Sequence, residues 1–300
     1  YNWLNSQKEQ CGYEDDPFGF VQGLTTGAER YMFYLTGGDG AGDNHLKNIV
    51  RLGGSASKLH LLLLLAAVNM DEQALTHLKA LLEAMGYYST VNQIKTNELE
   101  RLYAQWCKQI REIHTDEELT SFINNKIKPT ISQWKVNNRS NFMRIGFDSM
   151  QQYRVKFILA RITKYVDVRR KNGGDASNVA EFYEGGIEIE HIMPQKYSAV
   201  YGISEDDYNA AKQRLGNLTL LEKTINASIG DDAFASKSEA YKQSAYYLTR
   251  SIAQLDDVGQ QTAINRMNQK LRSWSSWGPS MIEDRQAILY DLSEEIWSID

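Results

Sequence analysis

The sequence contains little cysteine and no long hydrophobic segment. Its two cysteines, Cys11 and Cys107, lie far apart, and no Cys-x-x-Cys pair is present. A zinc site held by paired thiolates is therefore excluded, and this cysteine usage fits a reducing cytoplasm. The longest apolar run extends from Leu59 to Val68 and is interrupted by His60. Because this is about half of the ~20 residues that span a bilayer, we expect a buried helix and no membrane partner.

The sequence also lacks a nucleotide-binding signature. The glycine-rich run from Gly37 to Asp43 is a loop by composition. The Gly-Lys-Ser/Thr ending of a phosphate-binding loop does not follow it. No segment at the start resembles a signal peptide, and the first residue, Tyr1, is not a methionine. We therefore expect the chain to be part of a longer polypeptide.

The charge is acidic overall and basic in one stretch. The 300 residues carry a formal net charge of −5, which argues weakly against a nucleic-acid partner. Between Lys126 and Lys171, however, twelve basic residues stand against two acidic ones, a local balance of +10. A patch of one sign can steer a polyanion, so this basic block is a candidate DNA-binding surface, with an ordinary solvated face as the alternative. Its candidate DNA contacts are Arg154, Arg161, Lys164, Arg169 and Arg170.

The periodicity of the apolar residues predicts a mainly α protein. Residues 1–55 are rich in glycine and polar side chains and are expected to form an irregular entry segment. Apolar residues at three- and four-residue steps predict a helical domain over residues 56–184, which contains the basic block. A strong helical pattern covers residues 151–171, and further helices are expected over residues 246–300.

Residues 185–245 depart from this helical pattern. Alternating apolar and acidic residues from Ile187 lead to Glu190 and His191. Such alternation predicts a short strand, because successive side chains of a strand point to opposite faces. Pro194 ends the strand early. The acidic residue and the histidine are therefore expected at the end of a strand.

A second short strand is predicted from Asn217, and the helix after it carries Asn226. Nine positions separate the two asparagines, the interval from the middle Asn to the final His or Asn in many HNH sites. Taken singly, a Glu-His pair, a Gly-Asn turn and an Asn in a helix each have an ordinary structural explanation. Their joint order favours a small ββα-metal (HNH) nuclease motif embedded in a helical domain.

The residue types at these positions suit the hydrolysis of a phosphodiester. Such a reaction needs a base for the attacking water and a cation for the charge on the phosphate. His191 is the candidate base, because imidazole titrates near neutral pH. Glu190, Asn217 and Asn226 offer the hard oxygen ligands that Mg²⁺ or Mn²⁺ prefers, and all four residues are candidate catalytic residues. Lys237 is a candidate DNA contact at a phosphate oxygen, with an ordinary helix-surface position as the alternative.

At these residues the sequence resembles a known family. The residues that carry the resemblance are Glu190–Gln195, Leu215–Leu221, Asn226, Phe234, Lys237, Tyr241 and Ser244. They are similar to the C-terminal HNH domain of GmrSD-type modification-dependent restriction enzymes, an architecture shared with the phosphorothioate-sensing defence nuclease SspE. The resemblance implies that His191 is the general base and Asn217 a metal-site residue. Glu190 stands where the basic HNH pattern has Asp, and Asn226 stands for its last His.

The resemblance also implies a nucleotide-hydrolysing, DNA-sensing N-terminal domain, whose Asp-Gly-Gln-Gln-Arg signature is absent from this sequence. We therefore expect a cytoplasmic, Mg²⁺-dependent (or Mn²⁺-dependent) DNA endonuclease that acts as the effector part of a modification-sensing anti-phage restriction protein. Its expected partners are DNA and the sensor domain of the same polypeptide. Two alternatives stay open: a non-catalytic DNA-binding or regulatory module with a degenerate HNH fold, and an RNase.

Overall fold

Local sequence signals set the ends of several helices in the N-terminal half of the chain. The computed structural model describes residues 4, 6, 8–38, 43–53, 58–257, 259–260 and 262–299. The side chain of Asp16 caps α3 by accepting a hydrogen bond from the Gly19 amide at 2.9 Å, and Gly37 ends this helix, which covers Pro17–Thr36, with a φ of 87°. The helices of this half are α2 (Lys8–Cys11), α3 (Pro17–Thr36), α4 (Asn44–Gly53), α5 (Leu59–Ala66), α6 (Glu72–Val91), α7 (Thr96–Ile110), α8 (Asp116–Phe122), a π-helical turn (Ile123–Ile127), α9 (Lys128–Lys135) and α10 (Asn138–Phe142).

Two of these helices occupy the segment whose composition predicts irregular structure. Both α3 and α4 lie within residues 1–55, so the prediction is wrong for these residues. The glycines that suggested a loop include Gly19, Gly23 and Gly27, all of which lie inside α3. Glycine weakens a helix without forbidding it. Part of the predicted loop between Gly37 and Asp43 lies outside the described residues.

The C-terminal half contains a long central helix, a two-stranded sheet and a second group of helices. The helix predicted over residues 151–171 is confirmed as α11 (Gln152–Arg170). The remaining elements are β1 (Ile187–His191), α12 (Glu205–Gln213), β2 (Leu218–Glu222), α13 (Lys223–Ile229), α14 (Phe234–Tyr241), α15 (Tyr247–Ala253), α16 (Ala263–Asn268) and α17 (Pro279–Ile296), with short 3₁₀ turns at Ala180–Phe182, Ala199–Tyr201 and Leu215–Asn217. The prediction of a mainly α fold with a small ββα element is confirmed.

The two strands form an antiparallel pair in which Ile187 lies opposite Glu222 and His191 opposite Leu218. Helix α13 follows β2 without an intervening loop, because Glu222 is both the last residue of the strand and the N-cap of the helix. The strand and helix ends that carry the predicted site are therefore fixed relative to one another by backbone hydrogen bonds and by a direct connection.

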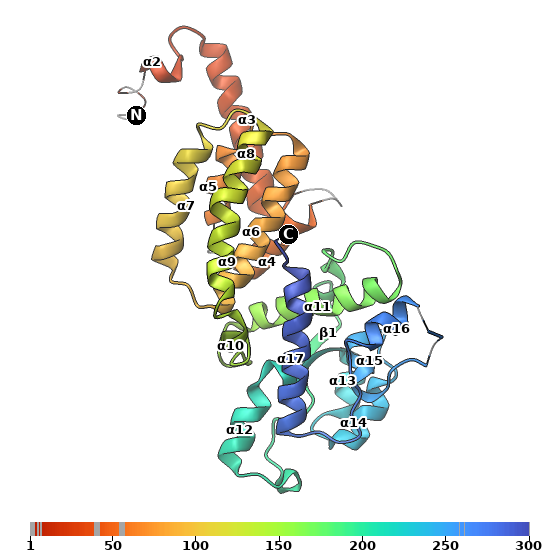
Figure 1. Cartoon of the computed structure of the whole chain (residues 1–300). Helices are drawn as coiled ribbons and strands as arrows, with labels where there is room; N and C mark the ends of the chain where they lie inside the picture. The colour runs from red at the N-terminus through yellow and green to blue at the C-terminus, as the bar shows by residue number, and fades with distance from the viewer. Residues whose placement is uncertain are drawn as a thin grey trace.

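Helices α11 and α17 join the two halves of the molecule. In Figure 1, α11 crosses the middle of the structure, with the N-terminal helices on one side of it and the elements of the ββα segment on the other. Helix α17 runs from the C-terminal group back to the N-terminal helices, where the ring of Trp297 stacks on Tyr87 at 3.8 Å. Tyr87 also donates a hydrogen bond to Ser293 at 2.7 Å. The core is therefore continuous across the two halves.

Candidate active site

Glu190 lies near the end of β1 in a buried environment, with two hydrogen-bond donors at one of its carboxyl oxygens. Its Oε1 accepts hydrogen bonds from the ammonium of Lys237 at 2.7 Å and from the hydroxyl of Tyr241 at 2.9 Å. Lys237 also donates to the backbone oxygen of His191 at 2.8 Å. Burial raises the pKa of the Glu190 carboxyl, and the charge of Lys237 opposes this rise. Lys237 and Tyr241 on α14 thus hold the carboxylate against the strand.

Lys237 does not have the exposure expected of a DNA contact. Its side chain is only 1% exposed and its ammonium lies between two protein oxygens. A phosphate would have to displace those oxygens or reach the lysine through the cavity described below. The position fits an internal partner of Glu190 better than a surface contact.

His191 is the last residue of β1, and its ring is also buried. Its Nδ1 lies 3.4 Å from the Nε2 of Gln195, while its Nε2 has no hydrogen-bond partner among the described residues. The ring of Phe147 meets it edge-on, with 5.0 Å between the centroids. Burial, together with the nearby charges of Lys237 and Lys212, lowers the pKa of His191 to about 4. The imidazole is therefore neutral at physiological pH.

Asn217 precedes β2, and both the oxygen and the nitrogen of its side-chain amide are hydrogen-bonded to other protein groups. Its Oδ1 accepts from the Met193 amide at 2.7 Å and from the indole of Trp277 at 2.9 Å. Its Nδ2 donates to the backbone oxygens of Met193 at 3.0 Å and of Lys212 at 2.9 Å. The side chain is fully buried. A metal ion at this oxygen would have to displace both donors, so the geometry fits a residue that anchors the segment after His191.

Asn226 lies on α13 and faces β1. Its Nδ2 donates to Glu188 Oε2 at 2.8 Å, and its side chain is half-buried. Glu188 and Glu190 occupy the same face of β1, because they are two positions apart in a strand. The helix and the strand are thereby connected through side chains at the expected site.

A cavity of about 230 Å³ unites three of the four predicted catalytic residues with Lys237. It is lined by Ile189, Glu190, His191, Gln195, Asn226, Gly230, Asp231 and Lys237. The structure therefore brings together the predicted base, the predicted acidic residue, the final asparagine and the lysine, and it leaves Asn217 behind the cavity wall. The exposed Asp231 is an acidic residue of this cavity that the sequence motif did not indicate.

The oxygen donors of this cavity suit a hard divalent cation that keeps much of its water. Among the described residues there is no group of three or more His, Cys, Asp or Glu side chains placed to hold a metal ion. Mg²⁺ is commonly held by one or two carboxylates, with water and substrate phosphate completing its six ligands. A carboxylate from Glu190 and an amide oxygen from Asn226 on one cavity match that smaller donor set.

The basic block is divided between the interior and the surface. Arg161 is buried, with its Nε 2.7 Å from Glu83 Oε1, so the prediction that it contacts DNA does not fit its position. Arg170 pairs with Asp256 at 2.9 Å. The other three predicted contacts are Lys164, which pairs with Glu181, the partly buried Arg154, and Arg169, which is exposed. Three of the five predicted contacts are therefore engaged in ion pairs within the protein.

Several residues that support the site gave no signal in the sequence. Trp277 and Arg285 come from the C-terminal region, 60 or more positions after Asn217. Arg285 is buried and donates to the backbone oxygens of Gly216 at 2.9 Å and Leu218 at 2.7 Å. Glu188 was detectable in principle, because it shares the period-two face of Glu190. Contacts of long sequence separation have no such local pattern.

The protein is mainly helical, and its ββα element places Glu, His and Asn side chains around one cavity. This is the arrangement expected of a nuclease. The family model for the C-terminal domain of GmrSD restriction endonucleases matches residues 134–292, and the chain belongs to this family. Membership supports an endonuclease role with DNA as the substrate. No curated protein matches the chain. Within the described residues, no helix is long and apolar enough to cross a membrane.

Proposed function

We propose that this chain is a metal-dependent DNA endonuclease of the HNH type and the effector part of a cytoplasmic, modification-sensing anti-phage restriction protein. The observation that carries the proposal is the convergence of Glu190, His191 and Asn226 on one cavity of the ββα element. Family membership supplies the reaction class. Recognition of the modification is assigned to a sensor domain of the same polypeptide, as the family resemblance implies.

His191 is the general base of the proposed reaction. Its low pKa keeps the imidazole neutral, and a neutral imidazole can take the proton of an attacking water. Asn217 positions this base, because its amide fixes both the N–H and the C=O of Met193, two residues further along the chain. Lys237 and Tyr241 orient the Glu190 carboxylate beside it.

Glu190 and Asn226 are the proposed holders of Mg²⁺ or Mn²⁺. When bound, the cation supplies positive charge for the scissile phosphate and the leaving oxygen. The charge of Lys237, on the side of α14, favours the ionised form of Glu190 and opposes the rise in its pKa that burial causes. Asn226 is in turn held by Glu188, so both proposed ligands have a second residue that fixes their orientation.

Plasmid nicking separates this proposal from a non-catalytic DNA-binding module. The wild-type chain is expected to nick supercoiled DNA with Mg²⁺ and to stop when EDTA is added. His191→Ala should lower the rate by about two to four orders of magnitude, the usual contribution of a general base. His77→Ala, at an exposed histidine of α6, is the matched control. Absence of nicking by the folded wild-type chain, or full activity in EDTA, would contradict the proposal, and cleavage of RNA but not DNA would favour an RNase.

A further inference from the structure

A cavity of about 730 Å³ lies in the helical half of the molecule, between α4, α5, α6, α7 and the first turn of α11. Its volume falls in the range of small-molecule binding sites, ~300–1,000 Å³. It shares no lining residue with the cavity of the candidate active site. Most of its lining precedes residue 134, where the family match begins. Family membership therefore assigns it no role.

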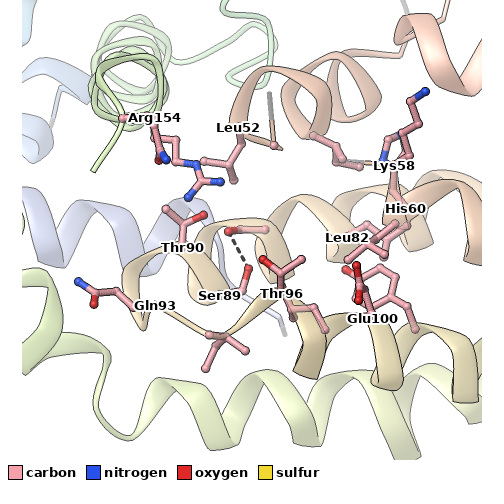
Figure 2. A pocket seen from close by; sticks show the side chains of 18 of the residues that line it. Leu52, Lys58, His60, Leu82, Ser89, Thr90, Gln93, Thr96, Glu100 and Arg154 are labelled. Carbon is pink, nitrogen blue, oxygen red and sulfur yellow. Dashed lines mark hydrogen bonds between the residues drawn. The ribbon is translucent and has the colours of Figure 1, made fainter. Parts of the chain in front are cut away.

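One end of this cavity carries positive charge. Arg154, in the first turn of α11, reaches towards Thr90 on α6 (Figure 2). Its Nε is buried and has no hydrogen-bond partner among the described residues. Gln151, the N-cap of α11, also lines the cavity and makes no side-chain capping bond. The first amides of a helix without such a cap attract anions, and they add to the charge of Arg154.

The wall of the cavity also contains apolar side chains and one unsatisfied polar atom. Leu52, Leu82 and Tyr103 are buried residues of its wall. His60 is also buried, and its Nε2 lies 3.3 Å from the backbone oxygen of Tyr34. Because a carbonyl oxygen only accepts, Nε2 carries the proton of the neutral ring. Nδ1 is then an acceptor, and it has no partner among the described residues.

The charges around the cavity favour one orientation of a bound molecule. Glu100 lies at the end opposite Arg154, and Lys58 points away from the cavity (Figure 2). A second negative group at the Glu100 end would be repelled, so a molecule with one anionic end is favoured. The apolar wall between the two ends suits a ring system.

We infer that this cavity binds a small organic anion, with its phosphate or carboxylate group at Arg154 and the start of α11 and its apolar ring against Leu52, Leu82 and Tyr103. An N–H or O–H donor on the ring would meet His60. The inference does not depend on the nuclease assignment, because it uses neither the residues nor the chemistry of the ββα element.

Calorimetric titration of the full chain with four matched compounds tests the inference. 1-Naphthyl phosphate and 1-naphthoate carry both the ring and the anion, 1-naphthol lacks the anion, and inorganic phosphate lacks the ring. Saturable one-to-one binding is expected for one or both naphthyl anions, and at least about tenfold weaker binding for the other two compounds. 1-Naphthol loses a hydrogen bond to a charged group, and inorganic phosphate loses the burial of the ring. Preference between the two anions identifies the phosphate or the carboxylate as the natural head group.

Two variants locate the bound compound. Arg154→Gln should weaken binding of the preferred anion about tenfold or more, whereas Arg169→Gln, an exposed arginine at the other end of α11, should not change it. Thr96→Trp places a large ring at an exposed position of the cavity lining and should abolish binding while the circular dichroism stays that of the wild type. The inference is overturned if neither naphthyl anion binds saturably. It is also overturned if Arg154→Gln and Thr96→Trp both bind the preferred anion as tightly as the wild type does.

Discussion

The two asparagines of the ββα element use their amides in different ways. Asn217 makes four hydrogen bonds inside the protein, with backbone groups of Met193 and Lys212 and with the indole of Trp277. Asn226 is half-buried, makes one hydrogen bond to Glu188, and lines the cavity. Identical side chains nine positions apart therefore have separate tasks: the first holds the backbone that follows His191, and the second presents an amide to the cavity.

Substituting each asparagine by alanine should separate these two tasks. Asn217→Ala leaves several buried polar groups unpaired, each at a cost of about 1–3 kcal/mol, so it should lower both the thermal midpoint and nicking. Asn226→Ala should lower nicking with a much smaller change in the thermal midpoint, because it removes one partly buried bond. Differential scanning calorimetry and plasmid nicking measure the two effects. Equal stability losses in the two variants would contradict this division of roles.

Because the pKa of His191 is lowered in the folded state, we expect the protein to lose stability at acidic pH. The folded value of about 4 lies below the ordinary 6.5, so between these limits the unfolded chain binds more protons at this residue than the folded chain does. The contribution of His191 to stability is therefore complete above pH 6.5 and is lost as the pH falls towards 4. Denaturant titrations across this range should show a shallower pH dependence for His191→Gln. Exposed His114→Gln is the control, and an unchanged slope in His191→Gln would show that the ring is not held neutral.

The sequence predicts the strand ends and the order of the site residues, but not which polar atoms remain available. Period-two alternation places Glu190 and His191 at the end of β1, and the structure has them there. The Trp277 indole that occupies the oxygen of Asn217 comes from 60 positions away. Likewise, Lys237, which lies on the separate helix α14, donates a hydrogen bond to Oε1 of Glu190. Whether an oxygen is open to a metal depends on such distant partners, and local spacing does not record them.

At the scale of elements, α11 shows that a helix rich in basic residues can have most of its side chains buried in the protein. Its apolar positions predict the helix correctly, and its arginines and lysines suggested a DNA-binding face. In the structure Arg161 is buried, and Glu83 is held by Arg161, by His45 at 2.7 Å and by the Trp297 indole at 3.1 Å. Burial alone would raise the pKa of Glu83, but Arg161 and His45 lower it below the usual value. The acidic partner lies on α6, 78 positions away, so the charge balance of the local sequence could not reveal the pair.

Replacing Arg161 should therefore affect folding rather than DNA recognition. Arg161→Met leaves Glu83 without its arginine, and breaking a buried ion pair on one side typically costs about 3–5 kcal/mol. Arg169→Met, at an exposed position of the same helix, should stay within about 0.5 kcal/mol of the wild type. Urea denaturation measures both values. If Arg161→Met keeps wild-type stability and binds DNA more weakly, the arginine is a DNA contact after all.

At the scale of the whole molecule, the family match and the folded unit have different limits. The match begins at residue 134, yet Tyr87 and Glu83 on α6 contact the C-terminal end of α17 through a ring stack and hydrogen bonds. Asn138 donates to Glu294 at 2.9 Å and, through Asn92, is joined to the end of α6. The helices before the match therefore complete the core on which α17 rests. Helix α17 in turn holds the Gly216–Leu218 turn through Arg285.

A chain reduced to residues 134–300 should consequently fail to fold as a stable unit. It would expose the face of α11 that packs against α4, and Trp297 would lose the ring of Tyr87. Exposing one large buried apolar side chain costs about 1.5–3 kcal/mol, so several such losses are comparable with the total stability of about 5–15 kcal/mol of an ordinary domain. A chain of residues 17–300, which removes only the segment before α3, is the control and should melt cooperatively and keep its nicking activity. Size-exclusion chromatography, thermal melting and plasmid nicking compare the two. Cooperative melting with full nicking by residues 134–300 would show that the matched region folds without the helical half.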